Sequence, residues 1–225
     1  MGKDLSGSEL YEAHYRFKER RSNARFFVVM LLVFLFFFGV RVYWTSTFGG
    51  VEIDGESMKH TLLDGQQLLM KYSDGGKDAE RGDVIVVYVG NYAECASVRS
   101  GFLIKRLIAI EGDTVKCVDG QVYIQYASCD EYEKLDEPYA HYRSEYDKQS
   151  YDFGPYKVGE GEIFFLGDNR NNSVDSRYGL TQGSHLPDRL YKAKDIFGIV
   201  PKWAIEKQEI LEKIFFTSSR RVEKN

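Results

Sequence analysis

The chain has 225 residues, 43% of them hydrophobic and 28% charged, with only 4 prolines, which excludes the disordered, collagen-like and repeat-rich classes of protein. Its formal net charge is −4, but residues 1–41 hold 7 Lys and Arg against 4 Asp and Glu, leaving 23 against 30 in the rest. The larger part of the chain is therefore acidic. Because nonspecific affinity for nucleic acids comes from clustered Lys and Arg, nucleic acid is not expected among the partners.

No metal site and no cofactor are predicted. The cysteines, Cys95, Cys117 and Cys129, form no Cys-x-x-Cys pair, and the 4 histidines are scattered, whereas zinc sites need ligands at short, regular spacings. Outside the cytoplasm Cys117 and Cys129 could pair and leave Cys95 free. Three free thiols are an equally good interpretation.

Residues 26–48 are predicted to form a transmembrane anchor. Residues 26–40 carry no polar side chain, and the apolar character resumes after Arg41 with Val42, Tyr43 and Trp44. Such a stretch rises only about 22 Å as a helix against a hydrocarbon core of about 30 Å, so the span must continue to about residue 48. A cleaved signal peptide would end in small residues, and a buried core helix would have a polar face; neither alternative fits.

The charges beside the span predict its orientation. The basic residues Arg16, Lys18, Arg20, Arg21 and Arg25 precede it, whereas Glu52, Asp54 and Glu56 follow it. Positive residues remain on the cytoplasmic side of a membrane. Residues 1–25 are therefore expected in the cytoplasm and the chain beyond about residue 49 on the far side, with the lipid bilayer as a partner.

Residues 49–205 are predicted to form a mainly β, extracytoplasmic domain of barrel or sandwich type. Their apolar runs are short and rich in β-branched residues, and turn signals such as Asp119-Gly120 separate them. No alternation of strands and helices is present, which argues against a doubly wound nucleotide-binding fold. The expected strands cover residues 84–89, 102–110, 114–118, 122–126, 163–166 and 196–200.

Two parts of the sequence depart from this pattern. Residues 127–160 are Tyr-rich and acidic without a clear period, which indicates a loop-rich insertion or a small subdomain between strands. Residues 206–225 place apolar side chains at roughly helical spacing before a basic tail, which predicts a short C-terminal packing helix. Contact with a membrane surface is the alternative for this last segment.

Two segments hold single polar residues of interest. In residues 53–62, Ser57 lies in a Gly-containing turn that can present its hydroxyl among free backbone N–H groups, although a capping or turn serine is the alternative. In residues 102–110, Lys105 shares a strand face with Leu103 and Leu107. Desolvation there would lower the pKa of a lysine toward that of a base, whereas an edge-strand charge would need no function.

A third segment, residues 165–179, is densely polar. Directly after an apolar strand it holds acidic and amide acceptors, two arginines and two serines, and Gly167 and Gly179 lie on either side. Such a loop is either a solvated turn or a buried network of hydrogen bonds of the kind that holds catalytic groups still.

In this order, and after an N-terminal anchor, the three segments resemble the bacterial type I signal peptidases. The family's box of Ser, Met, Pro, Thr and Leu is similar to residues 57–62, and its Lys-Arg pair with a following Gly-Asp-x-Val turn is similar to residues 105–106 and 112–115. Its Gly-Asp-Asn-Arg, Ser and Asp-Ser-Arg box is similar to residues 167–177. Three ordered boxes are far more specific than one.

The resemblance implies a single-pass plasma-membrane serine endopeptidase that removes signal peptides from exported preproteins at small-x-small sites. Ser57 would be the nucleophile, Lys105 the general base, and the Ser57 backbone N–H part of the oxyanion hole. Supporting roles would fall to residues of the polar loop and of the second box: Ser173 orienting Lys105, Asp175 and Arg177 bracing the loop, and Asp168 and Arg106 as further scaffold.

Two positions depart from the family pattern. His60 stands where the family usually has proline, and Gly55 stands where some members carry a second oxyanion hydroxyl. We interpret His60 as a tolerated replacement and expect backbone donors or water in place of the second hydroxyl.

Two rival functions are less well supported. A self-cleaving Ser-Lys regulator would carry a sensor or DNA-binding module, for which residues 1–25 are too few. A silent, membrane-tethered β-domain that binds a partner would be expected to lack Ser57 or Lys105, and both are present.

Overall fold

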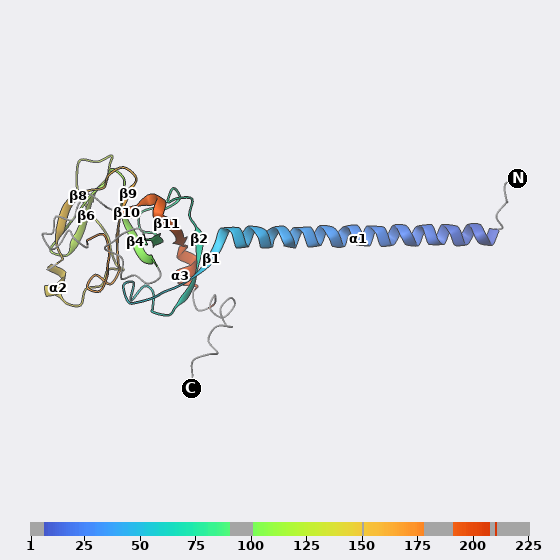
Figure 1. The fold of residues 1–225 in the computed structure, drawn as a ribbon, viewed down its shortest axis with the longest axis horizontal. Helices are drawn as coiled ribbons and strands as arrows, with labels where there is room; N and C mark the ends of the chain where they lie inside the picture. Colours follow the sequence, from blue (N-terminus) through green and yellow to red (C-terminus); the bar gives the residue numbers. More distant parts are fainter. Residues whose placement is uncertain (1–6, 91–100, 150, 178–190, 208–209, 211–225) are drawn as a thin grey trace, which may run out of the picture. The chain divides into compact units, whose positions relative to one another are not determined.

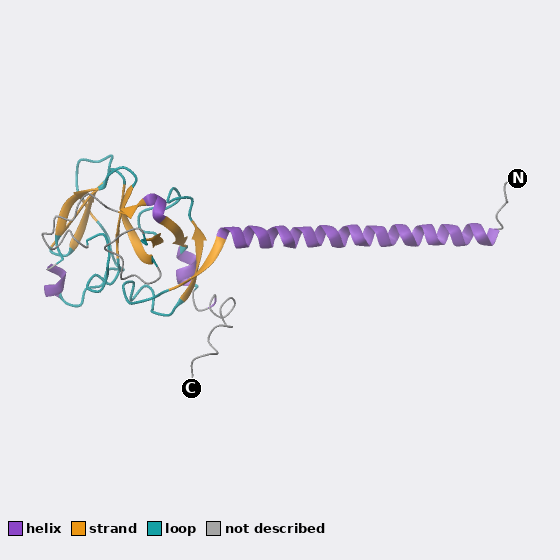
Figure 2. Ribbon diagram, in the orientation of Figure 1, coloured by secondary structure: helices purple, strands orange, loops and turns teal. Residues whose placement is uncertain are grey.

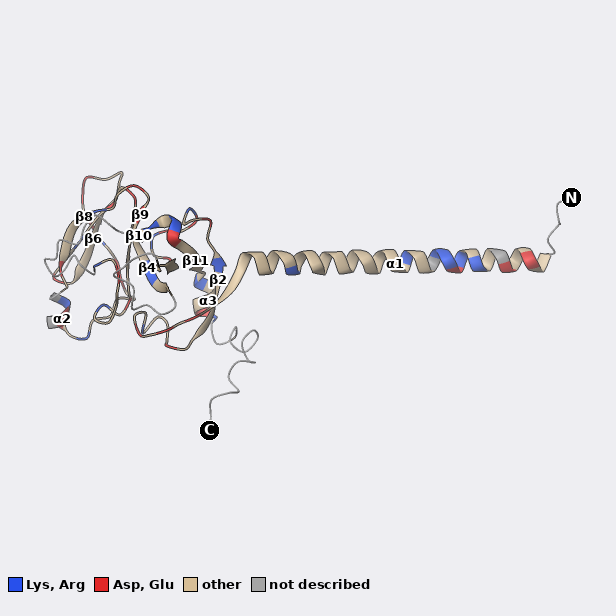
Figure 3. Ribbon diagram, viewed as in Figure 1, with Lys and Arg blue, Asp and Glu red and all other residues tan. Residues whose placement is uncertain are grey.

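The computed structural model describes residues 7–90, 101–149, 151–177, 191–207 and 210, and the chain divides into two compact units, Met1–Thr47 and Phe48–Asn225. The first unit contains one helix, α1 (Gly7–Thr47), of 41 residues (Figure 1). Figure 3 shows that most of its charged residues lie in the N-terminal half. Its most apolar window has a mean hydropathy of 2.5 and is not buried. The predicted apolar stretch therefore lies in a helix that is long and apolar enough to cross a membrane.

The second unit is built from two antiparallel sheets (Figure 2). The larger has the strand order β1-β2-β11-β3-β4-β9-β10 and the smaller the order β7-β6-β5-β8. The strands of the larger sheet are β1 (Phe48–Glu52), β2 (Gln67–Tyr72), β3 (Val84–Tyr88), β4 (Phe102–Ile110), β9 (Glu162–Leu166), β10 (Tyr191–Lys192) and β11 (Ile196–Val200). Those of the smaller are β5 (Thr114–Val118), β6 (Gln121–Gln125), β7 (Glu133–Lys134) and β8 (Phe153–Lys157), and short helices α2 (Glu145–Gln149), η2 (Ala193–Asp195) and α3 (Lys202–Glu206) complete the described elements.

The mainly β fold predicted from the sequence is confirmed. Each of the six predicted strands is present, with its ends within one residue of the expected positions. The Asp119-Gly120 pair turns the chain between β5 and β6, and both residues have positive φ, 52° and 69°. This is the conformation that a two-residue hairpin requires.

Some elements were not predicted. β1 contains Gly49 and Gly50, and β8 contains Gly154 and Pro155, residue types that are poor in strands. Residues 127–160 hold three short elements between loops, β7, α2 and β8, and β8 pairs with β5. The C-terminal helix was predicted within residues 206–225. Helix α3 ends at Glu206, where this range begins, and Ile210 is helical, whereas residues 208–209 and 211–225 lie outside the described part of the chain.

The structure describes two of the three cysteines. Cys117 is buried, Cys129 is half-buried, and both are free thiols. The pairing of these two that the sequence left open is therefore not formed in this structure. Cys95 lies outside the described residues.

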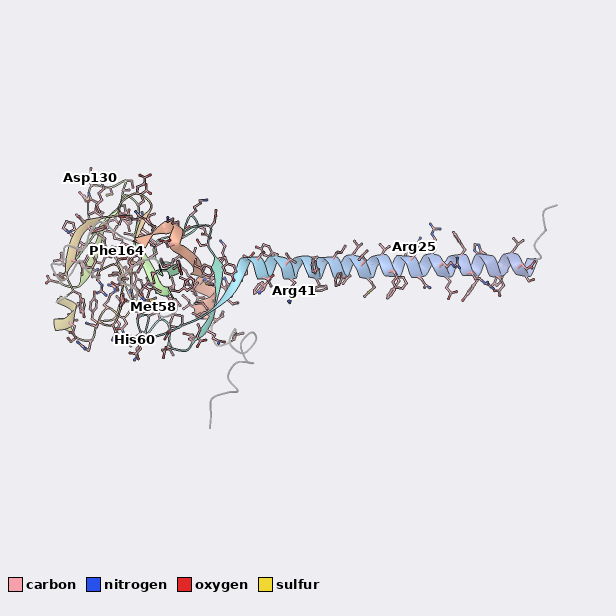
Figure 4. The ribbon with its side chains drawn as sticks, in the orientation of Figure 1. Arg25, Arg41, Met58, His60, Asp130 and Phe164 are labelled. Atoms are coloured by element: carbon pink, nitrogen blue, oxygen red, sulfur yellow. The ribbon has the colours of Figure 1, made fainter. Side chains whose placement is uncertain are left out.

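Three clusters of buried apolar side chains fill the domain, and β4 supplies residues to all of them. Ile104 packs against the cluster under β2, which includes Met58 and Leu62. Ile108 and Ala109 join the cluster between the two sheets, which contains the fully buried Phe164 (Figure 4), while Leu103 and Leu107 join the third. A rigid, well-packed β4 therefore carries Lys105 and Arg106.

Candidate functional site

The sheet brings the three polar segments together. β4 pairs antiparallel with β9, and Arg106 is the register partner of Leu166. The polar loop that begins at Gly167 therefore leaves β9 beside the Lys105-Arg106 pair. The turn with Ser57 lies between β1 and β2, and its backbone is bonded to the same loop, since the Asn169 N–H donates to the Ser57 carbonyl at 3.0 Å.

Ser57 and Lys105 are in direct contact. The Nζ of Lys105 lies 2.6 Å from the Oγ of Ser57 and 2.9 Å from the carbonyl oxygen of Ile104. Lys105 is only 2% exposed, whereas Ser57 is half-buried. An amine within hydrogen-bond reach of a partly exposed hydroxyl has the geometry in which a base can take the hydroxyl proton.

The residues on either side of Ser57 shape its turn: Met58 is buried in the core, and Gly55 has a positive φ. Met58 is fully buried and accepts hydrogen bonds at its carbonyl from the N–H groups of Thr61 and Leu62. Gly55 has a φ of 95°, a conformation that favours glycine, and its N–H donates to the Asp64 carboxylate at 2.7 Å. Figure 4 shows Met58 inside the domain and His60 at its periphery. The hydroxyl is thus presented by a turn whose next residue is locked in the core.

Asp168 and Arg106 form a buried ion pair next to Ser57 and Lys105, which are called the dyad from here on. Arg106 donates from Nε to one carboxylate oxygen of Asp168 at 2.9 Å and from Nη2 to the other at 2.6 Å. The Thr61 hydroxyl also donates to Asp168, and the Tyr139 ring lies 3.9 Å from the Arg106 guanidinium carbon. One carboxylate therefore ties the Ser57 turn to β4.

Asp175 and Arg177 form a second buried pair within the polar loop. Arg177 donates twice to the Asp175 carboxylate, at 2.9 and 2.8 Å, and the Gly167 N–H donates to it at 3.0 Å. Burial opposes ionisation of Asp175, but the Arg177 charge and these hydrogen bonds outweigh it and lower the pKa below the usual Asp range. The carboxylate is therefore held ionised as a brace of the loop.

Ser173 is placed beside the dyad without a hydrogen bond to Lys105. Its Oγ is buried and has no partner of good geometry within the described residues, although its hydroxyl contributes to the low pKa of Asp175. A Cβ added at Gly167 would meet Ser173 Oγ at 2.2 Å and the Ser57 carbonyl oxygen at 2.7 Å. Gly167 is therefore the residue that lets the loop approach the Ser57 turn.

Three contacts of this region were not predicted from the sequence. Asn169 bonds the Ser57 turn, the buried Arg170 pairs with Glu137 of the 127–160 segment, and the His60 ring lies 3.9 Å from the His141 ring between centroids. The Gly-Asp-Asn-Arg box named Asn169 and Arg170, but no pattern in residues 127–160 marked Glu137 as the partner of Arg170.

A cleft of about 620 Å³ opens beside the dyad. Ser57 and Lys105 line it, together with apolar residues of β1 to β4, of β11, of the Ser57 turn and of the polar loop: Val51, Ile53, Met58, Met70, Val86, Phe102, Leu103, Ile104, Val174 and Phe197. A mostly apolar cleft with a few convergent polar groups is the usual form of a ligand site.

The sequence was compared with known families. The model of the family described as signal peptidase, peptidase S26, matches residues 23–206. The chain belongs to this family. The match covers the apolar part of α1 and all three boxes, so the family predicted from the boxes is confirmed.

Curated relatives carry the corresponding name. A signal peptidase I P of Bacillus subtilis subsp. natto is 33% identical over 184 residues, covering 81% of this chain and 89% of that protein. A signal peptidase I of Bacillus licheniformis is 37% identical over 134 residues, which cover 57% of this chain and 65% of the relative. A crystal structure of a signal peptidase I from Enterococcus faecalis V583 matches at 25% identity and a TM-score of 0.38, covering 56% of this chain and 98% of that chain. As a member of the signal peptidase family, the chain is a peptidase of the class that cleaves signal peptides.

Proposed function

We propose that this signal peptidase is a membrane-anchored serine endopeptidase that cleaves N-terminal signal peptides from exported preproteins, with Ser57 as nucleophile and Lys105 as general base. The observation that carries the proposal is the 2.6 Å contact between the buried Nζ of Lys105 and Ser57 Oγ. Ser57 faces a cleft large enough for a peptide segment. No cofactor or metal ion is needed for this chemistry.

The reaction follows from these positions. The neutral amine of Lys105 takes the hydroxyl proton as Ser57 Oγ bonds to the scissile carbonyl carbon, and the carbonyl oxygen becomes an oxyanion that the Ser57 N–H stabilises. Collapse of this intermediate breaks the C–N bond, and Lys105 returns the proton to the leaving amine. Water then attacks the ester carbon and gives one proton to Lys105. The bond between the acyl carbon and Ser57 Oγ breaks, Lys105 returns the proton to Ser57 Oγ, and the product with the new carboxyl group leaves.

Supporting roles go to the two buried pairs and to Ser173. Arg106 and Asp168 hold β4 against the Ser57 turn, while Asp175 and Arg177 fix the loop that carries Ser173. Ser173 is proposed to orient the amine of Lys105 during turnover. Hydrogen-bonded surroundings of this kind limit the motion of catalytic groups.

We further propose that α1 is a single-pass anchor in the plasma membrane, with its basic N-terminal half in the cytoplasm and residues after Thr47 outside. The basic flank and the apolar stretch of α1 support this orientation. Only β1 and a short turn separate the anchor from Ser57 along the chain. A substrate held in the same bilayer by its own apolar segment would present its cleavage site, with small residues, to this nucleophile.

The proposal is tested with the full chain in lipid and a peptide that carries Ala-x-Ala after an apolar stretch. Mass spectrometry should show one cut after the second alanine for wild type, none for Ser57→Ala, and the wild-type product for Ser128→Ala, which removes an exposed turn serine. No cut by wild type would favour the silent binding domain. A cut by Ser57→Ala at the wild-type rate would exclude Ser57 as nucleophile.

A further inference from the structure

We propose that Asn169 is a positioning residue that sets the direction of the Ser57 backbone N–H and so builds the donor that stabilises the oxyanion. The inference rests on the proposed function, because it concerns the same hydrolytic step. It assigns a role to a side chain that lies behind the dyad and does not line the cleft.

Asn169 holds two successive carbonyl groups of the Ser57 turn. Its side-chain Nδ2 donates to the Glu56 carbonyl oxygen at 3.0 Å, and its backbone N–H donates to the Ser57 carbonyl oxygen at 3.0 Å. Asn169 is 9% exposed, so both hydrogen bonds are shielded from water. The assignment of Nδ2 is unambiguous because a carbonyl oxygen can only accept a hydrogen bond.

Peptide planarity converts this clamp into an orientation of the N–H group. The Glu56 carbonyl and the Ser57 N–H belong to one peptide plane, and in a trans peptide they point in opposite directions. When Asn169 fixes the carbonyl toward the polar loop, the Ser57 N–H must point away from that loop. Within the described residues no acceptor is bonded to this N–H, and both Glu56 and Ser57 line the cleft.

The Asn169 side chain is one of two donors to the Glu56 carbonyl oxygen, and the other is the Lys59 N–H at 3.0 Å. Gly55 has no atom within 4 Å of the position where a Cβ would lie, and Glu56 is exposed. A glycine followed by an exposed residue allows the intervening peptide planes to rotate at low cost. Without the Asn169 side chain, the Glu56 carbonyl would keep only the hydrogen bond from the Lys59 N–H. The Glu56–Ser57 peptide could then turn its N–H out of the cleft for part of the time while the Met58 anchor remains in place.

The expected effect concerns catalysis more than substrate binding. An oxyanion donor acts where charge develops in the transition state, and loss of one such donor lowers kcat by about 10²- to 10³-fold. A variant in which this N–H is misdirected for part of the time should lose less, about 10- to 100-fold in kcat. Its KM should change by no more than about 2-fold.

The test compares Asn169→Asp and Asn169→Ala with wild type in the full chain. Aspartate keeps the size of the side chain but, when ionised, cannot donate to the Glu56 carbonyl; alanine introduces no charge and carries the test if the aspartate variant does not fold. Asn171→Ala is the control, because Asn171 belongs to the same loop but does not line the cleft, and its side chain accepts a hydrogen bond from the Arg143 N–H. The readouts are kcat, KM, melting temperature, and the affinities of a substrate-like peptide aldehyde and of the product peptide.

The proposal predicts that both variants lose about 10- to 100-fold in kcat and the same factor in affinity for the aldehyde, whose adduct with Ser57 carries the oxyanion. Affinity for the product peptide should be unchanged, and the Asn171→Ala variant should behave as wild type does. A lower melting temperature with unchanged kcat, or a loss confined to KM, would overturn the inference alone. An inactive wild-type chain would overturn the proposed function and this inference with it.

Discussion

Arg106 and Asp168 form a buried, bidentate ion pair, with N···O distances of 2.9 and 2.6 Å. Arg106 directly follows Lys105 on β4, and Asp168 also accepts a hydrogen bond from Thr61 of the Ser57 turn. The pair therefore links β4, which carries Lys105, to the polar loop after β9 and to the Ser57 turn. Its removal should affect the stability of the fold and the position of Ser57 together.

Asp168→Ala is expected to destabilise the domain by about 3–5 kcal/mol, because it leaves the Arg106 guanidinium buried and unpaired. Melting of the full chain in detergent measures the effect as a loss of melting temperature. Asp74→Ala, which breaks an exposed pair with Lys77, is the matched control and should melt as wild type does. Equal melting of both variants would show that the buried pair contributes nothing to the fold.

The pH dependence of stability should report the Asp175–Arg177 pair. Because the folded pKa of Asp175 is lower than that of an unfolded chain, its ionised form stabilises the fold above pH 4, approximately, and this contribution is lost as the pH falls through the lowered pKa. Arg177→Met removes the cation, so burial then raises the pKa of Asp175. Acid unfolding should therefore begin at higher pH in this variant.

The measurement is an acid titration of near-ultraviolet circular dichroism, with Arg143→Met as control. Arg143 pairs with Asp147 at the surface, where its side chain is 76% exposed. An unfolding midpoint that stays at the wild-type pH in Arg177→Met would contradict the assignment of Asp175 as a buried carboxylate held ionised by Arg177.

The sequence predicted the central strands well because their signals are local. β3, β4 and β5 are short β-branched runs between turn residues, and β4 and β5 were predicted residue for residue. β1 and β8 were missed because glycine and proline interrupt them and because their pairing with β2 and β5 depends on contacts far along the chain. Local propensity contains no information about such contacts.

The candidate site shows the same division. An unusual turn and a lysine in an apolar strand drew attention to Ser57 and Lys105, but each also had an interpretation without function. The catalytic roles expected of these two residues, like those of the loop residues, came from the resemblance of the three boxes. Glu137 and Tyr139, which contact Arg170 and Arg106, lie in a segment without a period and gave no signal. Their role appears only when β8 and the polar loop place the segment beside the site.

His60 adopts a conformation that proline cannot adopt. Its φ is 83°, whereas the proline ring fixes φ near −65°. His60→Pro should therefore destabilise the domain by more than about 1 kcal/mol, while His60→Gly should be neutral or stabilise it by up to about 1 kcal/mol. His60→Ala keeps the Cβ and removes the ring contact with His141, which separates the two effects.

Melting temperatures of the three His60 variants check this prediction. A His60→Pro variant as stable as wild type would mean that the turn after Ser57 takes the backbone of the family's proline-containing box. In that case the interpretation of His60 as a simple replacement would hold in full.

Cys117 should be unreactive in the folded protein. Burial, with a smaller effect of the Asp152 charge, raises the pKa of its thiol to about 12, so only roughly one thiol in ten thousand is ionised at pH 8. Iodoacetamide should label the half-buried Cys129 first and Cys117 only after unfolding in urea, as read by peptide mapping. Equal labelling rates, or a disulfide between the two, would contradict the structure.

The central claim is that a neutral amine at Lys105 activates Ser57, and the cleavage rate of Lys105→Arg tests it most directly. Arginine keeps the positive charge but cannot act as a base near neutral pH. We predict a fall in rate of about 10²-fold or more for both Lys105→Arg and Lys105→Ala, with wild-type melting for at least one of them. Lys116→Ala, which removes a lysine from β5 in the other sheet, should cleave at the wild-type rate. Retention of activity by Lys105→Arg would contradict the account, because a charge alone would then suffice.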